Sequence, residues 1–282
     1  MTNREQAARE LAARIAGVRQ EARRNVLVFL EHVLTTDDGV PVRLAPIHRS
    51  WLQHVSWCWQ NNYHALVLAP FAHAKSTILA IGLTAFMLGR EPGKRIKIVA
   101  NDDDQARKRV RAVARILKHS RNFTEVFRGC RPAKEGSWTQ HELWLQGAEG
   151  AVRHDPSLQA RGIFTTGIGG RADYLVFDDV VDQRNALDQP DMRQRVIEDF
   201  HSTWLSRLEP DGRVMAVGTV WHREDLWHHL MRNPRWVTLR QSIKDNLSGI
   251  EQEVYGAPDS YPGLLDRERL DRDAKLTAAA LL

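Results

Sequence analysis

Residues 65–77 read ALVLAPFAHAKST, an apolar run followed by a loop that ends in a lysine and two hydroxyl residues. The apolar half predicts a buried strand that ends at Pro70, and residues 78–88 predict the helix that follows the loop. A phosphate-binding loop occupies this place between a strand and a helix, and it usually reads GxxxxGK(S/T). Here Ala69 and Ala74 stand where that pattern has glycines. Because the alanine methyl group restricts φ, the pattern alone leaves a plain strand–helix connection equally open.

Two further apolar strands end in residues that suit phosphate chemistry. Residues 174–179 read YLVFDD, like a Walker B strand, in which one carboxylate holds magnesium and the next orients the attacking water. Acidic pairs also occur as turn residues or helix caps, so this pair alone leaves its role open. Residues 214–219 read VMAVGT and deliver Thr219 at a strand end, although an ordinary buried strand is the favoured reading of that stretch by itself. The loop around Arg171 is either a flexible turn or the source of a guanidinium for the transferring phosphoryl group.

Composition sets broad limits on the function. The 282 residues are 43% hydrophobic and 27% charged, which is typical of a globular domain. The chain has 40 Lys and Arg against 35 Asp and Glu, a mildly basic balance that favours a polyanionic partner. Its two cysteines, Cys58 and Cys130, form neither a disulfide framework nor a zinc pattern. No apolar stretch reaches the roughly 18 residues that a membrane-spanning helix needs, so we expect no membrane contact and a reducing cytoplasm.

Apolar periodicity organises the chain as alternating strands and helices. This order predicts an α/β fold with a mostly parallel sheet flanked by helices, whose ligands bind beyond the carboxyl ends of the strands. One helix, after residues 101–104, buries Ala106, Val110, Val113 and Leu117 and carries Arg107, Lys108, Arg109, Arg111, Arg115 and Lys118. We interpret that basic face as solvated rather than as a DNA track. The expected strands are 65–69, 96–100, 142–145, 174–177 and 214–218, and the other expected helices are 2–33, 51–59, 78–88 and 188–208.

Taken in order, these motifs resemble the ATPase domain of the bacteriophage terminase large subunit, an additional-strand P-loop NTPase of the class that helicases also use. The agreement extends over about residues 43–271 and includes Pro46, His48, Trp51, Asp155-Pro156-Ser157-Leu158, Trp221-His222 and Asp225-Leu226. The resemblance implies three parts: a helical arm (1–42), the ATPase core (43–250) and a linker segment (251–282). The nuclease domain of that family is absent, so we interpret the chain as a truncated or separated ATPase domain.

The resemblance also assigns roles to individual residues, with ATP and Mg²⁺ as cofactors. It implies that Ser76 and Asp178 hold the metal, that Asp179 replaces the catalytic glutamate, that Thr219 couples hydrolysis to movement, and that Arg171 acts in the site of a neighbouring subunit. Two departures stand out, because Phe71 and Val220 occupy positions where family members often have arginine. The residues that the resemblance places around the nucleotide are His48, Pro70, Phe71, Ala72, His73, Ala74, Lys75, Ser76 and Thr77.

By the same resemblance, the chain hydrolyses ATP to move double-stranded DNA into a procapsid. Its partners would be DNA, the portal protein, a small terminase subunit and further copies of itself in a ring, usually a pentamer. It would act in the host cytoplasm, docked transiently on the viral procapsid.

Three alternatives stay open. The first is another DNA-dependent P-loop motor, such as a helicase. The second is a catalytically weakened or non-hydrolysing module that binds DNA or portal, which Ala69, Ala74 and Phe71 favour. The third, ranked last, is a two-metal nuclease built on Asp173, Asp178, Asp179 and Asp182.

Overall fold

A mixed eight-stranded sheet forms the centre of the computed structural model, which describes residues 3–36, 38–134, 138–146, 154–166, 169–244 and 249–262. The strands are β1 (His64–Leu68), β2 (Ile96–Ala100), β3 (Glu142–Leu143), β4 (Leu158–Gly162), β5 (Ala172–Asp178), β6 (Leu208–Gly218), β7 (Trp236–Lys244) and β8 (Gly249–Tyr255). Their order across the sheet is β3-β4-β2-β5-β6-β1-β7-β8. Only the outermost pairs, β3 with β4 and β7 with β8, are antiparallel, which confirms the mostly parallel sheet.

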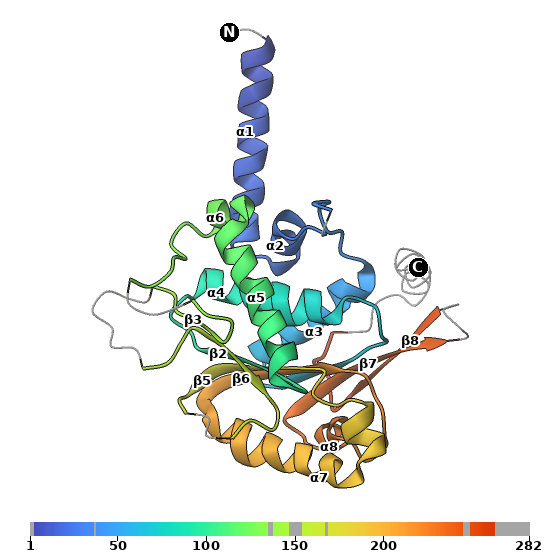
Figure 1. Cartoon of the computed structure of the whole chain (residues 1–282). Coiled ribbons are helices and arrows are strands. Elements are labelled where there is room, and N and C mark those ends of the chain that lie inside the picture. The colour runs from blue at the N-terminus through green and yellow to red at the C-terminus, as the bar shows by residue number, and fades with distance from the viewer. Residues whose placement is uncertain are drawn as a thin grey trace.

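Helices cover both faces of this sheet (Figure 1). The upper layer in Figure 1 packs its apolar side chains with Ala65, Val67 and Ile98 in one core cluster. The lower layer packs with Leu66, Leu68 and their neighbours on the opposite face. Upper-layer helices are α1 (Asn3–Ala22), α2 (Val26–Val33), α3 (Pro46–Gln60), η1 (Ser76–Leu83), α4 (Thr84–Arg90), α5 (Asp103–His119) and α6 (Arg121–Val126). Lower-layer helices are η2 (Arg184–Asp188), α7 (Pro190–Asp199), η3 (Phe200–Trp204), η4 (Leu205–Arg207) and α8 (Leu226–Met231).

Strand β6 is the feature that places the site. It pairs in parallel with β1 on one side and with β5 on the other, so one additional strand separates the strand before the phosphate-type loop from the acidic strand. The register aligns Leu68 with Gly218 and Val217 with Asp178, so the three strands end together. The expected additional-strand fold is therefore confirmed, and its residues of interest meet at one edge of the sheet.

The N-terminal region differs from the single helix expected over residues 2–33. The first helix ends at Ala22, and a separate helix, α2, begins after Asn25. The side chain of Asn25 caps α2 by accepting a hydrogen bond from the Leu27 N–H at 3.0 Å. Helix α2 belongs to the core, whereas α1 projects from the body (Figure 1). On α1, Leu11 is 58% exposed and Val18 is 42% exposed, so helical spacing there does not mark a buried face.

Further along, the sequence predicts no strand at β4, β7 or β8, and several expected boundaries are wrong. The helix expected over 51–59 begins at Pro46, and the helix expected over 78–88 is η1 followed by α4. The single helix expected over 188–208 is instead α7 followed by the short turns η3 and η4. Strand β6 begins at Leu208 rather than 214, with an irregularity in its pairing to β5 after Ala172. Strand β8 pairs with β7 on both sides of residue 250, the limit set between core and linker. Residues 263–282 of that linker lie outside the described part of the chain, and the domain limits stay predictions.

The sequence has no apolar stretch as long as a membrane-spanning helix. In the part of the chain that the structure describes, no helix is both long and apolar enough to span a bilayer.

Candidate active site

The loop between β1 and η1 takes a left-handed backbone at two alanines. Ala72 has φ of 60° and Ala74 has φ of 58°, in the region that glycine adopts most readily. Helix η1 begins directly after the loop at Ser76, so its first N–H groups face the loop without acceptors inside the helix. Alanine thus replaces glycine here without preventing the left-handed turns that such a loop needs.

Lys75 is the buried centre of the loop. Its Nζ donates to the carbonyl oxygens of Ala69 at 3.0 Å and Pro70 at 2.9 Å, and to the Thr219 hydroxyl at 2.9 Å. Burial lowers the pKa of Lys75 below its ordinary value, while the charges of Asp179 and Asp178 oppose that shift. The ammonium group therefore links the loop to the end of β6, at a position next to the two carboxylates.

His48 supports the loop from α3. Its Nδ1 accepts from the Ala45 N–H at 3.2 Å, so the neutral ring carries its proton on Nε2 and donates it to the His73 carbonyl at 3.1 Å. Burial lowers the pKa of His48 to about 4, which keeps the ring neutral at pH 7. The structure thus shows His48 in contact with the loop backbone, and direct contact with a nucleotide stays a prediction.

Asp178 ends β5 as a fully buried carboxylate with two partners. Its Oδ1 accepts from the Ser76 hydroxyl at 3.0 Å, and its Oδ2 accepts from Arg109 Nε at 2.7 Å. Arg109 comes from α5, the helix whose basic face was expected to be solvated. For Arg109 that expectation is wrong, because the side chain turns inward and is only 16% exposed.

Asp179 follows Asp178 at the point where the strand turns away. Its φ is 50°, a left-handed value that Asp and Asn tolerate better than most residues with a Cβ. Burial raises the pKa of Asp179 to about 6, helped by the charge of Asp178 and opposed by Lys75 and Arg109. A carboxyl group with a pKa near neutrality is suited to accept a proton from water.

The end of β6 is held by packing below it. Trp227 of α8 donates through Nε1 to the Thr219 carbonyl at 3.0 Å, and a Cβ on Gly218 would lie only 2.5 Å from the same indole. Asp225 is fully buried and accepts from the Trp221 N–H at 3.2 Å. Trp221 in turn packs edge-on against Phe71, with ring centroids 5.4 Å apart. The Gly-Thr pair therefore needs its glycine for close approach, and Thr219 faces Lys75 from a rigid base.

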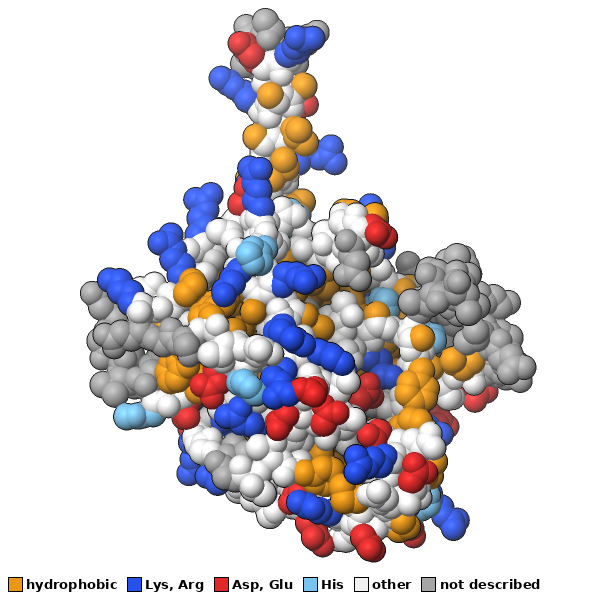
Figure 2. All heavy atoms as spheres, in the orientation of Figure 1, with side chains coloured by type: hydrophobic (Ala, Val, Ile, Leu, Met, Phe, Trp, Pro, Cys, Tyr) orange, Lys and Arg blue, Asp and Glu red, His pale blue; other side chains and the backbone are white. Residues whose placement is uncertain are grey.

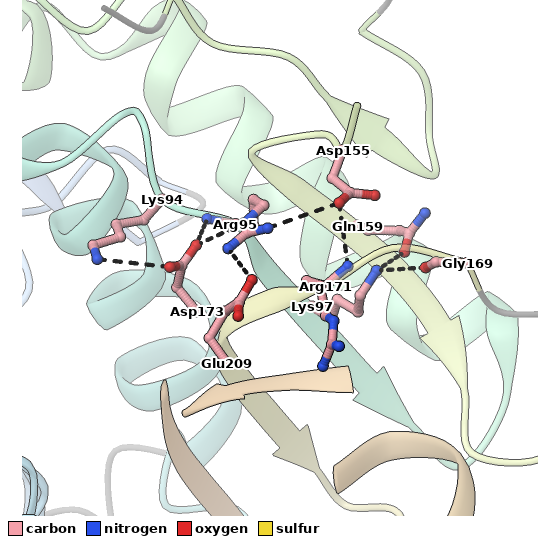
Figure 3. A network of polar contacts seen from close by, with 9 residues as sticks. All are labelled: Lys94, Arg95, Lys97, Asp155, Gln159, Gly169, Arg171, Asp173 and Glu209. Atoms are coloured by element: carbon pink, nitrogen blue, oxygen red, sulfur yellow. Dashed lines mark hydrogen bonds and ion pairs between the residues drawn. The ribbon is translucent and has the colours of Figure 1, made fainter. Parts of the chain in front are cut away.

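Arg171 and Asp173 lie at the opposite edge of the sheet, where β5 begins (Figure 3). Asp173 accepts from Arg95 Nε at 2.9 Å, and Arg95 Nη2 donates to Glu209 at 2.7 Å. The Arg171 N–H donates to Asp155 at 3.1 Å, and its exposed guanidinium donates to the Ser206 carbonyl at 3.4 Å. Arg171 is thus remote from the phosphate-type loop of its own chain.

The same placement contradicts the nuclease alternative. Asp173 begins β5 and Asp178 ends it, so the four aspartates do not form one metal cluster. Asp182 accepts from Asn101 at 2.9 Å and from the Asn185 N–H at 2.8 Å, which engages both of its oxygens. Within the described ranges, no group of three or more His, Cys, Asp or Glu side chains is arranged to hold a metal.

The residues at the loop edge do fit a magnesium nucleotide. Magnesium prefers oxygen ligands and keeps waters and substrate phosphates in its shell, so one carboxylate and one hydroxyl from the protein suffice. Asp178 and Ser76 offer that pair, and Lys75 and the start of η1 offer positive charge for phosphates. All of these residues were expected from the sequence, whereas Arg109 was not expected to be their partner.

Comparison with solved structures identifies a similar fold. The crystal structure of the HK97 bacteriophage large terminase matches 91% of this chain with a TM-score of 0.56 and 13% sequence identity. The chain has the fold of a phage large terminase. It spans 52% of the solved chain, and an identity this low extends the likeness to the fold alone. No protein-family model and no curated protein matches this sequence.

Proposed function

We propose that this chain is the ATPase motor domain of a phage-type large terminase, which hydrolyses ATP to move double-stranded DNA into a procapsid. The observation that carries this proposal is the meeting of Lys75, Ser76, Asp178, Asp179 and Thr219 at the ends of three adjacent strands. The additional strand between loop and acidic pair, and the terminase fold, support it.

Each residue of this edge has a task in the proposed reaction. Lys75 exchanges its carbonyl acceptors for terminal phosphate oxygens, and Ser76 and Asp178 hold the metal. The bound magnesium ion would neutralise charge on the phosphates. Asp179 accepts a proton from the attacking water and orients it. The Thr219 hydroxyl accepts a hydrogen bond from Lys75, so it changes its partner when Lys75 moves and transmits the state of the phosphates to β6.

Arg171 is proposed to act on the site of a neighbouring subunit in a ring, usually a pentamer. Its position favours a task outside its own chain, because its guanidinium is exposed while Asp155 fixes its backbone. Gly170, with φ of 75°, would clash with Asp155 if it carried a Cβ, so this turn requires glycine.

DNA, portal protein and a small terminase subunit are the proposed partners, in the host cytoplasm and on the procapsid. Figure 2 shows Lys and Arg side chains over the face formed by α1 and α5. On α5, Arg107 pairs with Asp104 and Arg109 with Asp178, which takes both away from any DNA track. The exposed basic residues of α5 are Lys108, Arg111, Arg115 and Lys118.

The acidic pair gives the sharpest test of hydrolysis. Asp178→Asn should weaken magnesium–ATP binding and hydrolysis together. Asp179→Asn should leave ATP binding nearly intact while hydrolysis falls by roughly 10²–10⁴-fold, as for the loss of a general base. Asp179→Glu should retain hydrolysis. The proposal fails if Lys75→Ala and Asp179→Asn both hydrolyse ATP like the parent.

A non-hydrolysing module is the second candidate. Phe71 is 56% exposed in the loop where relatives often carry arginine, and this loss of charge favours weakened turnover. Nucleotide binding without turnover, in the presence of DNA and at high protein concentration, would select this candidate.

A further inference from the structure

Arg109 bridges the two residues that are proposed to hold the metal. Its Nε donates to Asp178 Oδ2 at 2.7 Å, and its Nη2 lies 3.5 Å from the Ser76 hydroxyl oxygen. Asp178 has no exposed surface. A buried carboxylate needs a compensating charge, and in this structure the guanidinium supplies it.

The guanidinium is also held from behind. Its Nη1 donates to Gln105 Oε1 at 2.7 Å, one turn earlier on the same helix. That turn is fixed because Asp102 caps α5 by accepting from the Gln105 N–H at 2.7 Å, and because Ala106 and Val110 are fully buried. Arg109 is therefore presented to the site by a rigid helix start.

A magnesium ion held by Ser76 and Asp178 would compete with Arg109, because the guanidinium donates to Asp178 Oδ2 and lies 3.5 Å from the Ser76 hydroxyl oxygen. Binding of magnesium nucleotide would therefore displace Arg109 from this pair. The displaced side chain stays anchored on α5 beside the loop. Its planar donor fork matches phosphate oxygens, which arrive with the nucleotide.

We propose that Arg109 is a catalytic arginine of its own chain, which pairs with Asp178 and Ser76 as this structure shows and transfers to the terminal phosphate when magnesium nucleotide binds. This inference rests on the proposed ATPase function. Arg109 would then supply the site with a positive charge from α5. The resembled family often has arginine in the loop instead, at the position that Phe71 occupies in this chain.

Nucleotide preference of Arg109→Gln tests the transfer. The parent, Arg109→Gln and the control Arg128→Gln, an exposed arginine outside α5, are titrated with fluorescent ATP and ADP, with magnesium and without DNA. Arg109→Gln should lose about 10- to 100-fold in its preference for ATP over ADP, as expected for a lost charge-assisted hydrogen bond. Arg128→Gln should keep the parental preference.

Magnesium alone provides a readout independent of turnover. Without nucleotide, Mg²⁺ should raise the melting temperature of Arg109→Gln, whose Asp178 lacks its partner, more than that of the parent or of Arg128→Gln. If Arg109→Gln folds poorly, Arg109→Lys keeps the charge but loses the planar fork, and it should lose part of the ATP preference.

The outcomes separate the two proposals. If the parent binds ATP and both Arg109 variants keep its preference over ADP within about twofold, this inference is overturned while the ATPase proposal stands. If the parent and Lys75→Ala alike bind no nucleotide, the ATPase proposal fails and this inference fails with it.

Discussion

Glycine at position 74 would test whether the loop carries backbone strain that its alanines create. Ala74 has φ of 58°, and a left-handed backbone costs a residue with a Cβ roughly 1–2 kcal/mol. Glycine removes that cost but loses about 0.5–1 kcal/mol more conformational entropy on folding. The two effects leave Ala74→Gly neutral or more stable than the parent by up to about 1.5 kcal/mol.

The control is the same substitution in an ordinary helix. Ala114 lies in the middle of α5 and is half-buried, so Ala114→Gly should destabilise the protein by about 1 kcal/mol. Urea denaturation of both variants measures the difference, which should be about 1–2.5 kcal/mol in favour of Ala74→Gly. Equal destabilisation by the two substitutions would refute the left-handed geometry of the loop.

Three further predictions concern pH, salt and assembly. Burial lowers the pKa of His48, His54 and His64 from 6.5 to about 4, so their contribution to stability is present above pH 6.5 and is lost as the pH falls towards 4. The free energy of unfolding should therefore be higher at pH 7 than at pH 5 by about 2 kcal/mol per histidine. His54→Gln should reduce this dependence of the unfolding free energy on pH. DNA binding should be independent of the DNA sequence, and its affinity should fall steeply with salt. Neutralising Arg111 and Arg115 together should reduce the slope of log K against log salt by about 2 in a filter-binding titration. A salt-insensitive affinity for one DNA sequence would contradict this prediction. ATPase activity should rise with protein concentration or with portal, and Arg171→Ala should abolish that rise; full activity in dilute Arg171→Ala would remove its role in a neighbouring site.

The strand ends were predictable because their signals are local. An apolar run followed by Lys75-Ser76-Thr77, or by Asp178-Asp179, identifies both the strand and its polar end without knowledge of the partners. Parallel strands align their carboxyl ends, so these residues were expected to meet, and the structure brings Ser76 and Asp178 into a 3.0 Å hydrogen bond.

Arg109 was missed for a different reason. Its position lies three residues after Ala106 and four before Val113, at the border of the buried face of α5, where helical spacing permits an inward side chain. The surrounding run of basic residues suggested solvent instead. Only the fold shows that this border faces the end of β5, because α5 follows β2 and β2 pairs with β5.

Two of the strands that the sequence does not predict, β4 and β7, bury polar side chains whose partners are distant in sequence. In β4, Gln159 accepts from the buried Lys97 of β2 at 2.6 Å. In β7, Gln241 accepts from Trp51 Nε1 of α3 at 2.5 Å and donates to Ser50 at 3.1 Å. A glutamine in the interior needs such partners, since an unpaired buried amide is costly. Polar residues interrupt the apolar runs of β4 and β7, so apolar patterning overlooks these two strands. It finds β2 despite Lys97, because the other residues of that strand are apolar. Apolar patterning also fails in the opposite direction on α1. Leu11 and Val18 have the helical spacing of a buried face, but both side chains are exposed.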